Sequence, residues 1–288
     1  MGMAFPRAAA VARPKHPSPM SRRLIRAILI LIACVWFVAG PAAHAERLSA
    51  DIESRIAVLK EGTGRPPMFC MQTLGGNVDQ FAGLAKHLNS DAPVYAVLPK
   101  SDGAKVYGVT AVAADASRVI AQIQGQGPYV VCGFSSGGAL ALEVARQLDD
   151  SDSLVVMFDS INPAVEGNKG YVQRILDLLG RGWQSLKTKS LAELWDKSYA
   201  FVRRTWSYWG HEPEPSGLRV LLFQQQATLD AAEDPTFGWG RVVGSRLQVE
   251  IIEGTHGAML AVPLVADTAS RLDRRLADYC DTVPRCTR

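Results

Sequence analysis

Residues 129–138, which read Tyr-Val-Val-Cys-Gly-Phe-Ser-Ser-Gly-Gly, decide the fold of this chain. The stretch begins as an apolar run typical of a buried strand, and residues 139–148 after it have the pattern of a helix. Between them, Gly-Phe-Ser-Ser-Gly fits the nucleophile elbow, a sharp strand-to-helix turn that raises a serine hydroxyl above a sheet edge. Gly133 and Gly137 lack a Cβ, which lets strand and helix approach closely. The pattern predicts Ser135 as a nucleophile, and the alternative is a small-residue turn without chemistry.

Residues 1–45 are predicted to be a targeting segment. They contain no Asp or Glu, carry six Lys or Arg residues, and hold an apolar run over residues 27–40 followed by Ala43-His44-Ala45. This composition is typical of a secretory signal peptide, cleaved here before Glu46, with Met20 as an alternative start. An uncleaved N-terminal membrane anchor is the alternative, because the run is only a few residues short of spanning length. A lipoprotein box ending at Cys34 fits less well, since apolar residues follow it. We therefore expect an exported protein, either periplasmic or secreted.

The expected leader affects how the net charge and the cysteines of the chain are interpreted. The whole chain has a formal charge of +3, and six positive charges lie in the leader, so residues 46–288 are near −3. No basic patch with interleaved aromatic residues is present, which argues against nucleic acid as a partner. Cys280 and Cys286 are close in sequence and are expected to form a disulfide in an oxidising compartment. Cys70 and Cys132 lie in apolar runs and are expected to be buried free thiols. No Cys/His spacing suggests a metal site, and no cofactor is expected.

The remaining chain, residues 46–288, is predicted to form one α/β domain. Strand and helix patterns alternate, which favours a mostly parallel sheet with helices on both faces. The strand patterns cover residues 56–60, 66–71, 94–98, 129–134, 154–158, 218–223 and 247–252. Helix patterns cover residues 81–88, 112–123 and 139–148. The aromatic-rich stretch of about 161–215 interrupts the alternation and is interpreted as a helical lid beside the site.

A nucleophilic serine needs a base and an acid, and the sequence offers candidates for each. Asp159 follows a strand of five apolar residues, at the sheet edge where catalytic groups of such folds collect. Asp230 and Asp234 are the alternatives. Of the three histidines after the leader, only His256 follows the last strand and so completes the order Ser, Asp, His.

Donors for a developing oxyanion are expected from two backbone positions. Ser136 opens the helix after the elbow, and helix N-terminal N–H groups favour negative charge. Gly75 and Gly76 follow the strand pattern at 66–71, so the loop there turns tightly, and the N–H of Leu74 is the predicted second donor. The alternative for this loop is an ordinary Gly-Gly turn.

Taken together, these motifs make the chain similar to the thioesterase domains of nonribosomal peptide and polyketide synthases, from about residue 66 to residue 276. The resemblance implies an α/β-hydrolase fold, the triad Ser135, Asp159 and His256, and an oxyanion hole of the Leu74 and Ser136 N–H groups. Asp230 stays in reserve because some relatives take the acid from after the next strand. The motifs on which the resemblance depends are Gly75-Gly76-Asn77-Val78, the elbow with its helix, Phe158-Asp159-Ser160, Gly238-Trp239 and residues 254–260, which read Gly-Thr-His-Gly-Ala-Met-Leu.

The chain also departs from that family. It has Gln72-Thr73 where the family has His-Pro, and it carries a leader, whereas the family usually acts in the cytoplasm on acyl chains tethered to carrier proteins. We therefore expect an exported serine hydrolase that cleaves a small-molecule or acyl ester or thioester, or transfers its acyl group. Membrane contact is expected only through an uncleaved leader, and a carrier protein is an uncertain partner. The alternatives are a carboxylesterase or lipase, and a non-catalytic binding protein on the same fold.

Overall fold

The computed structural model describes residues 50–63, 66–73, 77–99, 108–165, 205, 207–230 and 234–287. The chain divides into two units, Met1–Asp51 and Ile52–Arg288, and only the second is described in detail. The expected signal peptide, the Gly75-Gly76 turn and most of the expected lid lie outside the described residues. Within the part of the chain that is described, no helix is both long and apolar enough to cross a membrane.

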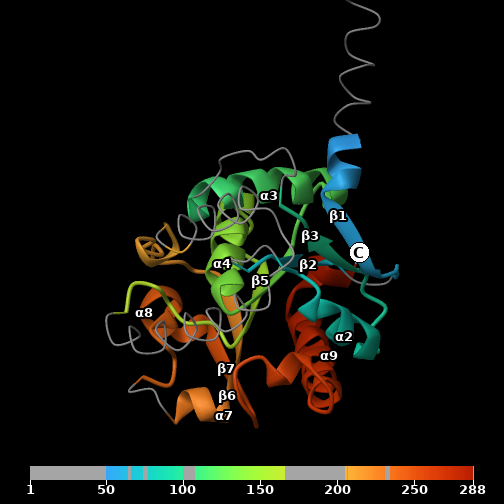
Figure 1. Ribbon diagram of the computed structural model, residues 1–288. Helices are drawn as coiled ribbons and strands as arrows, with labels where there is room; N and C mark the ends of the chain where they lie inside the picture. The colour runs from blue at the N-terminus through green and yellow to red at the C-terminus, as the bar shows by residue number, and fades with distance from the viewer. Residues whose placement is uncertain are drawn as a thin grey trace, which may run out of the picture. The chain divides into compact units, whose positions relative to one another are not determined.

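A seven-stranded sheet forms the centre of the second unit (Figure 1). The strands are β1 (Ile56–Lys60), β2 (Met68–Met71), β3 (Val94–Val97), β4 (Val130–Phe134), β5 (Leu154–Phe158), β6 (Arg219–Gln225) and β7 (Leu247–Ile252). Their order across the sheet is β1-β3-β2-β4-β5-β6-β7. Only the β1–β3 pairing is antiparallel, and all the others are parallel. The α/β-hydrolase fold class expected from the sequence is confirmed.

Helices cover both faces of this sheet (Figure 1). They are α2 (Gln80–His87), α3 (Val109–Gln124), α4 (Ser136–Leu148), α7 (Gln226–Leu229), α8 (Trp239–Val243) and α9 (Val265–Thr282), with 3₁₀ turns η2 (Gly244–Arg246), η3 (Ala258–Leu260) and η4 (Pro284–Thr287). One core packs α2 and α9 against the sheet, and a second packs α3, α4 and α8 against the opposite face. Every residue of β2 and β5 is buried, because helices cover both faces of the sheet at these strands.

The cysteines occupy the places expected of them. Cys280 and Cys286 form a disulfide that ties the end of α9 to η4, with their Cα atoms 5.1 Å apart. Cys70 and Cys132 are buried free thiols that lie opposite each other on the paired strands β2 and β4. Burial is the main cause that raises the pKa of the Cys132 thiol well above its usual range, so this group stays protonated and unreactive.

Close packing at the elbow predicts a specific glycine requirement. A Cβ on Gly133 would lie 2.0 Å from the backbone oxygen of Gly137, which is too near for any side chain. We expect Gly133→Ala to lower the free energy of unfolding in urea by about 3 kcal/mol or more, since the clash is with backbone. The control is Gly217→Ala, because no atom lies within 4 Å of that added Cβ. Its effect is expected to stay within about 1 kcal/mol. Equal stabilities of the two variants would contradict this account of the turn.

Candidate active site

Ser135 lies at a strained turn between β4 and α4. Its backbone has φ 53° and ψ −122°, a conformation that L-residues rarely adopt and that costs on the order of 1–3 kcal/mol. The Ser135 N–H donates to the carbonyl oxygen of Phe158 at 2.8 Å, which extends the β4–β5 pairing one residue past the end of β4. The sharp turn expected from the sequence is therefore present at Ser135, between the last residue of β4 and the first residue of α4.

The loop after β2 packs against the start of α4. A Cβ on Gly137 would lie 3.0 Å from the backbone oxygen of Gln72 and 3.2 Å from that of Met71. The absence of a side chain at Gly137 therefore lets this loop come within van der Waals distance of the elbow. Ser136 is the first residue of α4, as an oxyanion donor requires. Leu74, the other expected donor, lies outside the described residues.

Asp159 leaves the sheet beside the elbow. It follows the last residue of β5, is fully buried, and has a positive φ of 46°. Its N–H donates to the carbonyl oxygen of Phe223 on β6 at 2.7 Å. Its side-chain Oδ2 lies 2.5 Å from Nδ1 of His256. When Nδ1 donates to this carboxylate, the neutral imidazole presents Nε2 as an acceptor, which is the tautomer a general base needs.

His256 lies in the loop between β7 and η3, with glycines at positive φ on either side. Gly254 has φ 115° and Gly257 has φ 86°. The imidazole stacks on the ring of Phe134, with centroids 4.9 Å apart and planes inclined by 26°. Because Phe134 directly precedes Ser135, this stacking holds the imidazole beside the elbow. The His256 side chain is 22% exposed, so the site can be reached from solvent.

The other candidate acids lie in different environments. Asp230 accepts a hydrogen bond from the side-chain amide of Gln226 at 2.6 Å on the surface. Asp234 accepts bonds from the backbone N–H and hydroxyl of Thr236, at 2.8 and 2.7 Å. Among the described residues, Asp159 is the carboxylate that contacts His256. The structure thus brings together Asp159, His256 and the Ser135 elbow, and leaves Asp230 and Asp234 in separate hydrogen bonds.

A residue that sequence reasoning did not single out completes this arrangement. Thr228, on α7, is buried, and its hydroxyl donates to Oδ2 of Asp159 at 3.3 Å. The same carboxylate oxygen therefore receives hydrogen bonds from His256 and Thr228. The helix that carries Thr228 is tied to the histidine loop, because the Ala227 N–H donates to the carbonyl oxygen of Gly254. No sequence motif marks Thr228, and only its position three residues after the end of β6 could have drawn attention to it.

Metal chemistry has no visible support in the described part of the chain, where no three His, Cys, Asp or Glu side chains cluster as ligands. A strained serine after a central parallel strand, with a buried aspartate in contact with a partly exposed histidine at the same edge, is typical of the α/β-hydrolase class with a serine nucleophile.

Comparison with known proteins gives the family. The model of the thioesterase domain matches residues 66–273, so the chain belongs to the thioesterase domain family. It is 23% identical over 271 residues to chondramide synthase cmdD of Chondromyces crocatus, and 31% identical over 130 residues to a dimodular nonribosomal peptide synthase of Bacillus subtilis (strain 168). These matches cover 77% and 43% of this chain but only 7% and 6% of the two relatives. The chain thus corresponds to a small part of each relative.

Solved structures show the same fold. The NocB thioesterase domain, in covalent complex with a fluorophosphonate nocardicin G analogue, aligns with a TM-score of 0.61 and 22% identity over 77% of this chain and 99% of that one. The four-domain nonribosomal peptide synthetase AB3403 aligns with a TM-score of 0.62 and 18% identity, over 76% of this chain and 20% of that one. These alignments show that the chain shares the fold of thioesterase domains, in agreement with its family.

The contact between Thr228 and Asp159 predicts a role in positioning. Thr228→Val keeps the shape of the side chain but removes the hydroxyl, and we expect kcat for a p-nitrophenyl ester to fall about tenfold, as one hydrogen bond to a charged group is lost. Thr228→Ser is the control, because it retains the hydroxyl and should restore most of kcat. A shape-filling role alone would give the opposite order, with the valine variant active and the serine variant impaired.

Proposed function

We propose that this protein is an exported serine hydrolase that cleaves an acyl ester or thioester through Ser135, His256 and Asp159. The observation that carries the proposal is the 2.5 Å contact of Asp159 with His256, whose ring stacks on Phe134 next to the strained serine. Family membership over residues 66–273 supports the same reaction class.

The proposed reaction has two steps that use one base. His256 Nε2 takes the proton of the Ser135 hydroxyl while the serine oxygen attacks the carbonyl carbon, and the proton then passes to the departing thiol or alcohol. The acyl group is left as an ester on Ser135. Water then attacks this ester as His256 takes its proton, and the proton returns to the serine oxygen as the acid leaves. Asp159 keeps the imidazole in the required tautomer and stabilises its cationic form.

Negative charge on the attacked oxygen is assigned to the N-terminal end of α4. The Ser136 N–H begins that helix, where the helix dipole favours an anion. We assign the second donor to the N–H of Leu74, on the loop that approaches Gly137. In sites of this kind the loss of one donor costs roughly 3 kcal/mol of transition-state stabilisation.

The substrate is proposed to be a small acyl ester or thioester outside the cytoplasm. The acidic-residue-free leader supports export, and the Cys280–Cys286 disulfide is of a kind that persists in oxidising compartments. The matched relatives are peptide synthetases, of which this chain covers only a small fraction, so a carrier-bound chain is one candidate form of the substrate. A panel of acyl thioesters and p-nitrophenyl esters of several chain lengths, assayed in parallel, would rank these candidates.

Covalent labelling tests the nucleophile. Because a fluorophosphonate forms a covalent complex with the related NocB domain, we expect a fluorophosphonate probe to label this protein, with loss of labelling in Ser135→Ala. Ser136→Ala is the matched control, since it leaves its backbone N–H and the neighbouring hydroxyl of Ser135 in place. Persistent labelling of Ser135→Ala, confirmed to be folded by circular dichroism, would refute the assignment.

The choice of acid can be tested separately. Asp159→Asn favours the wrong imidazole tautomer and should lower kcat by about four orders of magnitude, as in other triads. Asp230→Asn alters a surface hydrogen bond to Gln226 and should change kcat less than about threefold. Steady-state kinetics on one p-nitrophenyl ester decide between them. A severe loss in Asp230→Asn, with Asp159→Asn active, would move the acid to the next strand.

A further inference from the structure

A cavity lies at the amino ends of β5, β6 and β7, away from the candidate active site. It has a volume of about 300 Å³, at the lower end of the range for small-molecule sites. Ser135 and Asp159 follow the carboxyl ends of their strands, whereas Leu154 and Arg219, which line the cavity, are the first residues of β5 and β6. Leu154 and Asp159 are five residues apart along β5, which at about 3.3 Å per residue separates the two regions by roughly 16 Å. The cavity is therefore distinct from the hydrolase site.

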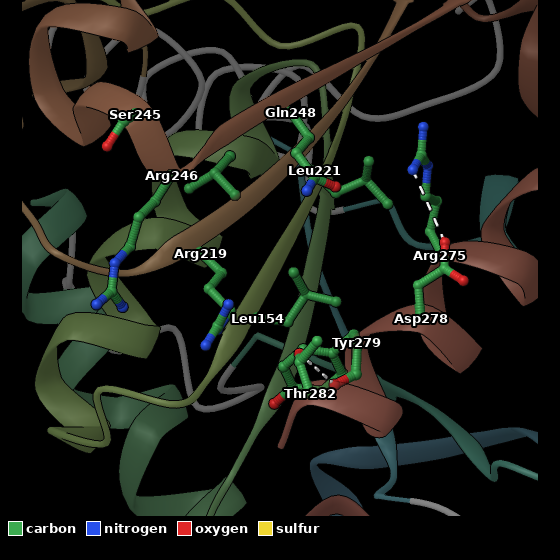
Figure 2. Close-up of a pocket in the computed structure, with 11 residues that line it drawn as sticks. Leu154, Arg219, Leu221, Ser245, Arg246, Gln248, Arg275, Asp278, Tyr279 and Thr282 are labelled. Atoms are coloured by element: carbon green, nitrogen blue, oxygen red, sulfur yellow. Dashed lines mark hydrogen bonds and ion pairs between the residues drawn. The ribbon is translucent and has the colours of Figure 1, made fainter.

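Its lining combines an apolar floor with basic side chains (Figure 2). The residues come from the first parts of three strands, from η2 and from the last turns of α9: Leu154, Arg219, Val220, Leu221, Ser245, Arg246, Gln248, Arg275, Asp278, Tyr279 and Thr282. In Figure 2, Arg219 and Arg246 extend from β6 and η2 in the same direction, and Arg275 belongs to α9 on the other side of the view.

The arginines differ in whether their charge is already balanced. Arg275 donates from Nε to Glu250 at 2.7 Å and also lies 3.8 Å from Asp278, so it is neutralised by protein carboxylates. No ion pair within the described residues involves Arg219 or Arg246. The Nε atom of Arg219 is buried and lacks a hydrogen-bond partner in the described part of the chain. A buried donor of this kind is destabilising unless an acceptor reaches it.

Other polar groups around the cavity are either used or uncharged. Burial is the main cause that raises the pKa of Tyr279, and its neutral hydroxyl already donates to the carbonyl oxygen of Asp152 at 2.7 Å. The Thr282 hydroxyl donates to the carbonyl oxygen of Tyr279 at 2.8 Å. Gln248 and Ser245, both exposed, can add neutral donors at the rim. The donors that remain for a ligand are therefore dominated by two cationic guanidinium groups.

We propose that this cavity binds a small oxyanion, a carboxylate or a phosphate group, between Arg219 and Arg246. A planar guanidinium matches the paired oxygens of either group with two parallel N–H···O bonds. The anion supplies the acceptor that Arg219 Nε lacks, and Leu154 and Leu221, which share one face of the sheet, accommodate a short apolar part of the ligand. Binding to the folded state alone stabilises it by mass action, so an effect on thermal unfolding is expected.

Thermal unfolding and calorimetry of the full chain, at fixed ionic strength, test the proposal with three probes: inorganic phosphate, butyrate and the neutral amide butyramide. We expect phosphate, butyrate or both to raise Tm and to bind with a stoichiometry of one, while butyramide does neither. Protection by phosphate alone identifies a phosphate ligand, and protection by butyrate alone identifies a carboxylate. Absence of protection by both anions, or equal binding of butyramide, would overturn the proposal.

Variants locate the binding to this cavity. Arg219→Gln and Arg246→Gln should each weaken anion binding by roughly tenfold, the effect of losing a charge-assisted contact. Arg246 is exposed, so its variant is expected to fold even where Arg219→Gln does not. Arg274→Gln is the matched control, because Arg274 is an exposed arginine of α9 that does not line the cavity. Unchanged binding in Arg246→Gln, or equal losses in the control, would place the anion elsewhere on the surface and refute the assignment.

Discussion

One backbone hydrogen bond, from the Ser135 N–H to the Phe158 carbonyl oxygen, organises the candidate site. It continues the parallel pairing one residue past β4, against the last residue of β5. Because Phe134 and Phe158 are paired, Ser135 and Asp159 leave the sheet at the same level. The equivalent bond from Asp159 to Phe223 fixes the next strand in the same way. Serine and aspartate therefore sit on neighbouring strands because of sheet register, and only the histidine must be brought in by a loop.

This arrangement holds two residues in unfavourable backbone conformations. Ser135 and Asp159 both have positive φ without being glycine, at a cost on the order of 1–3 kcal/mol each. Such strain persists only where the surrounding packing leaves no alternative. The strands that precede them supply that packing, since Val131, Val156 and Phe158 are all fully buried. The apolar runs that predict the fold are thus also what keeps the two polar side chains at the sheet edge.

Local patterns in the sequence were enough to predict the strands, the elbow and the order of Ser135, Asp159 and His256 along the chain. Each of these depends on neighbouring residues: an apolar run, a glycine pair, or a position directly after a strand. The choice among Asp159, Asp230 and Asp234 was not local, because it depends on which strand ends lie beside the histidine loop. Thr228 was missed for the same reason. Its hydroxyl contacts Asp159, which is 69 residues away in the sequence. No rule of residue spacing indicates such a contact.

Strand β6 runs from the cavity at Arg219 towards the candidate active site at Asp159. Its residues from Val220 to Gln225 are buried, so a charge is tolerated only where the strand begins, at Arg219. A charged group at that end needs a counter-ion or solvent, whereas the buried carboxylate at the other edge already has His256 and Thr228. Because β6 is paired with both of its neighbours, an anion at its amino end can stabilise the fold without moving the residues of the candidate active site. Stability and turnover should therefore respond independently to ligands at the two ends of the sheet.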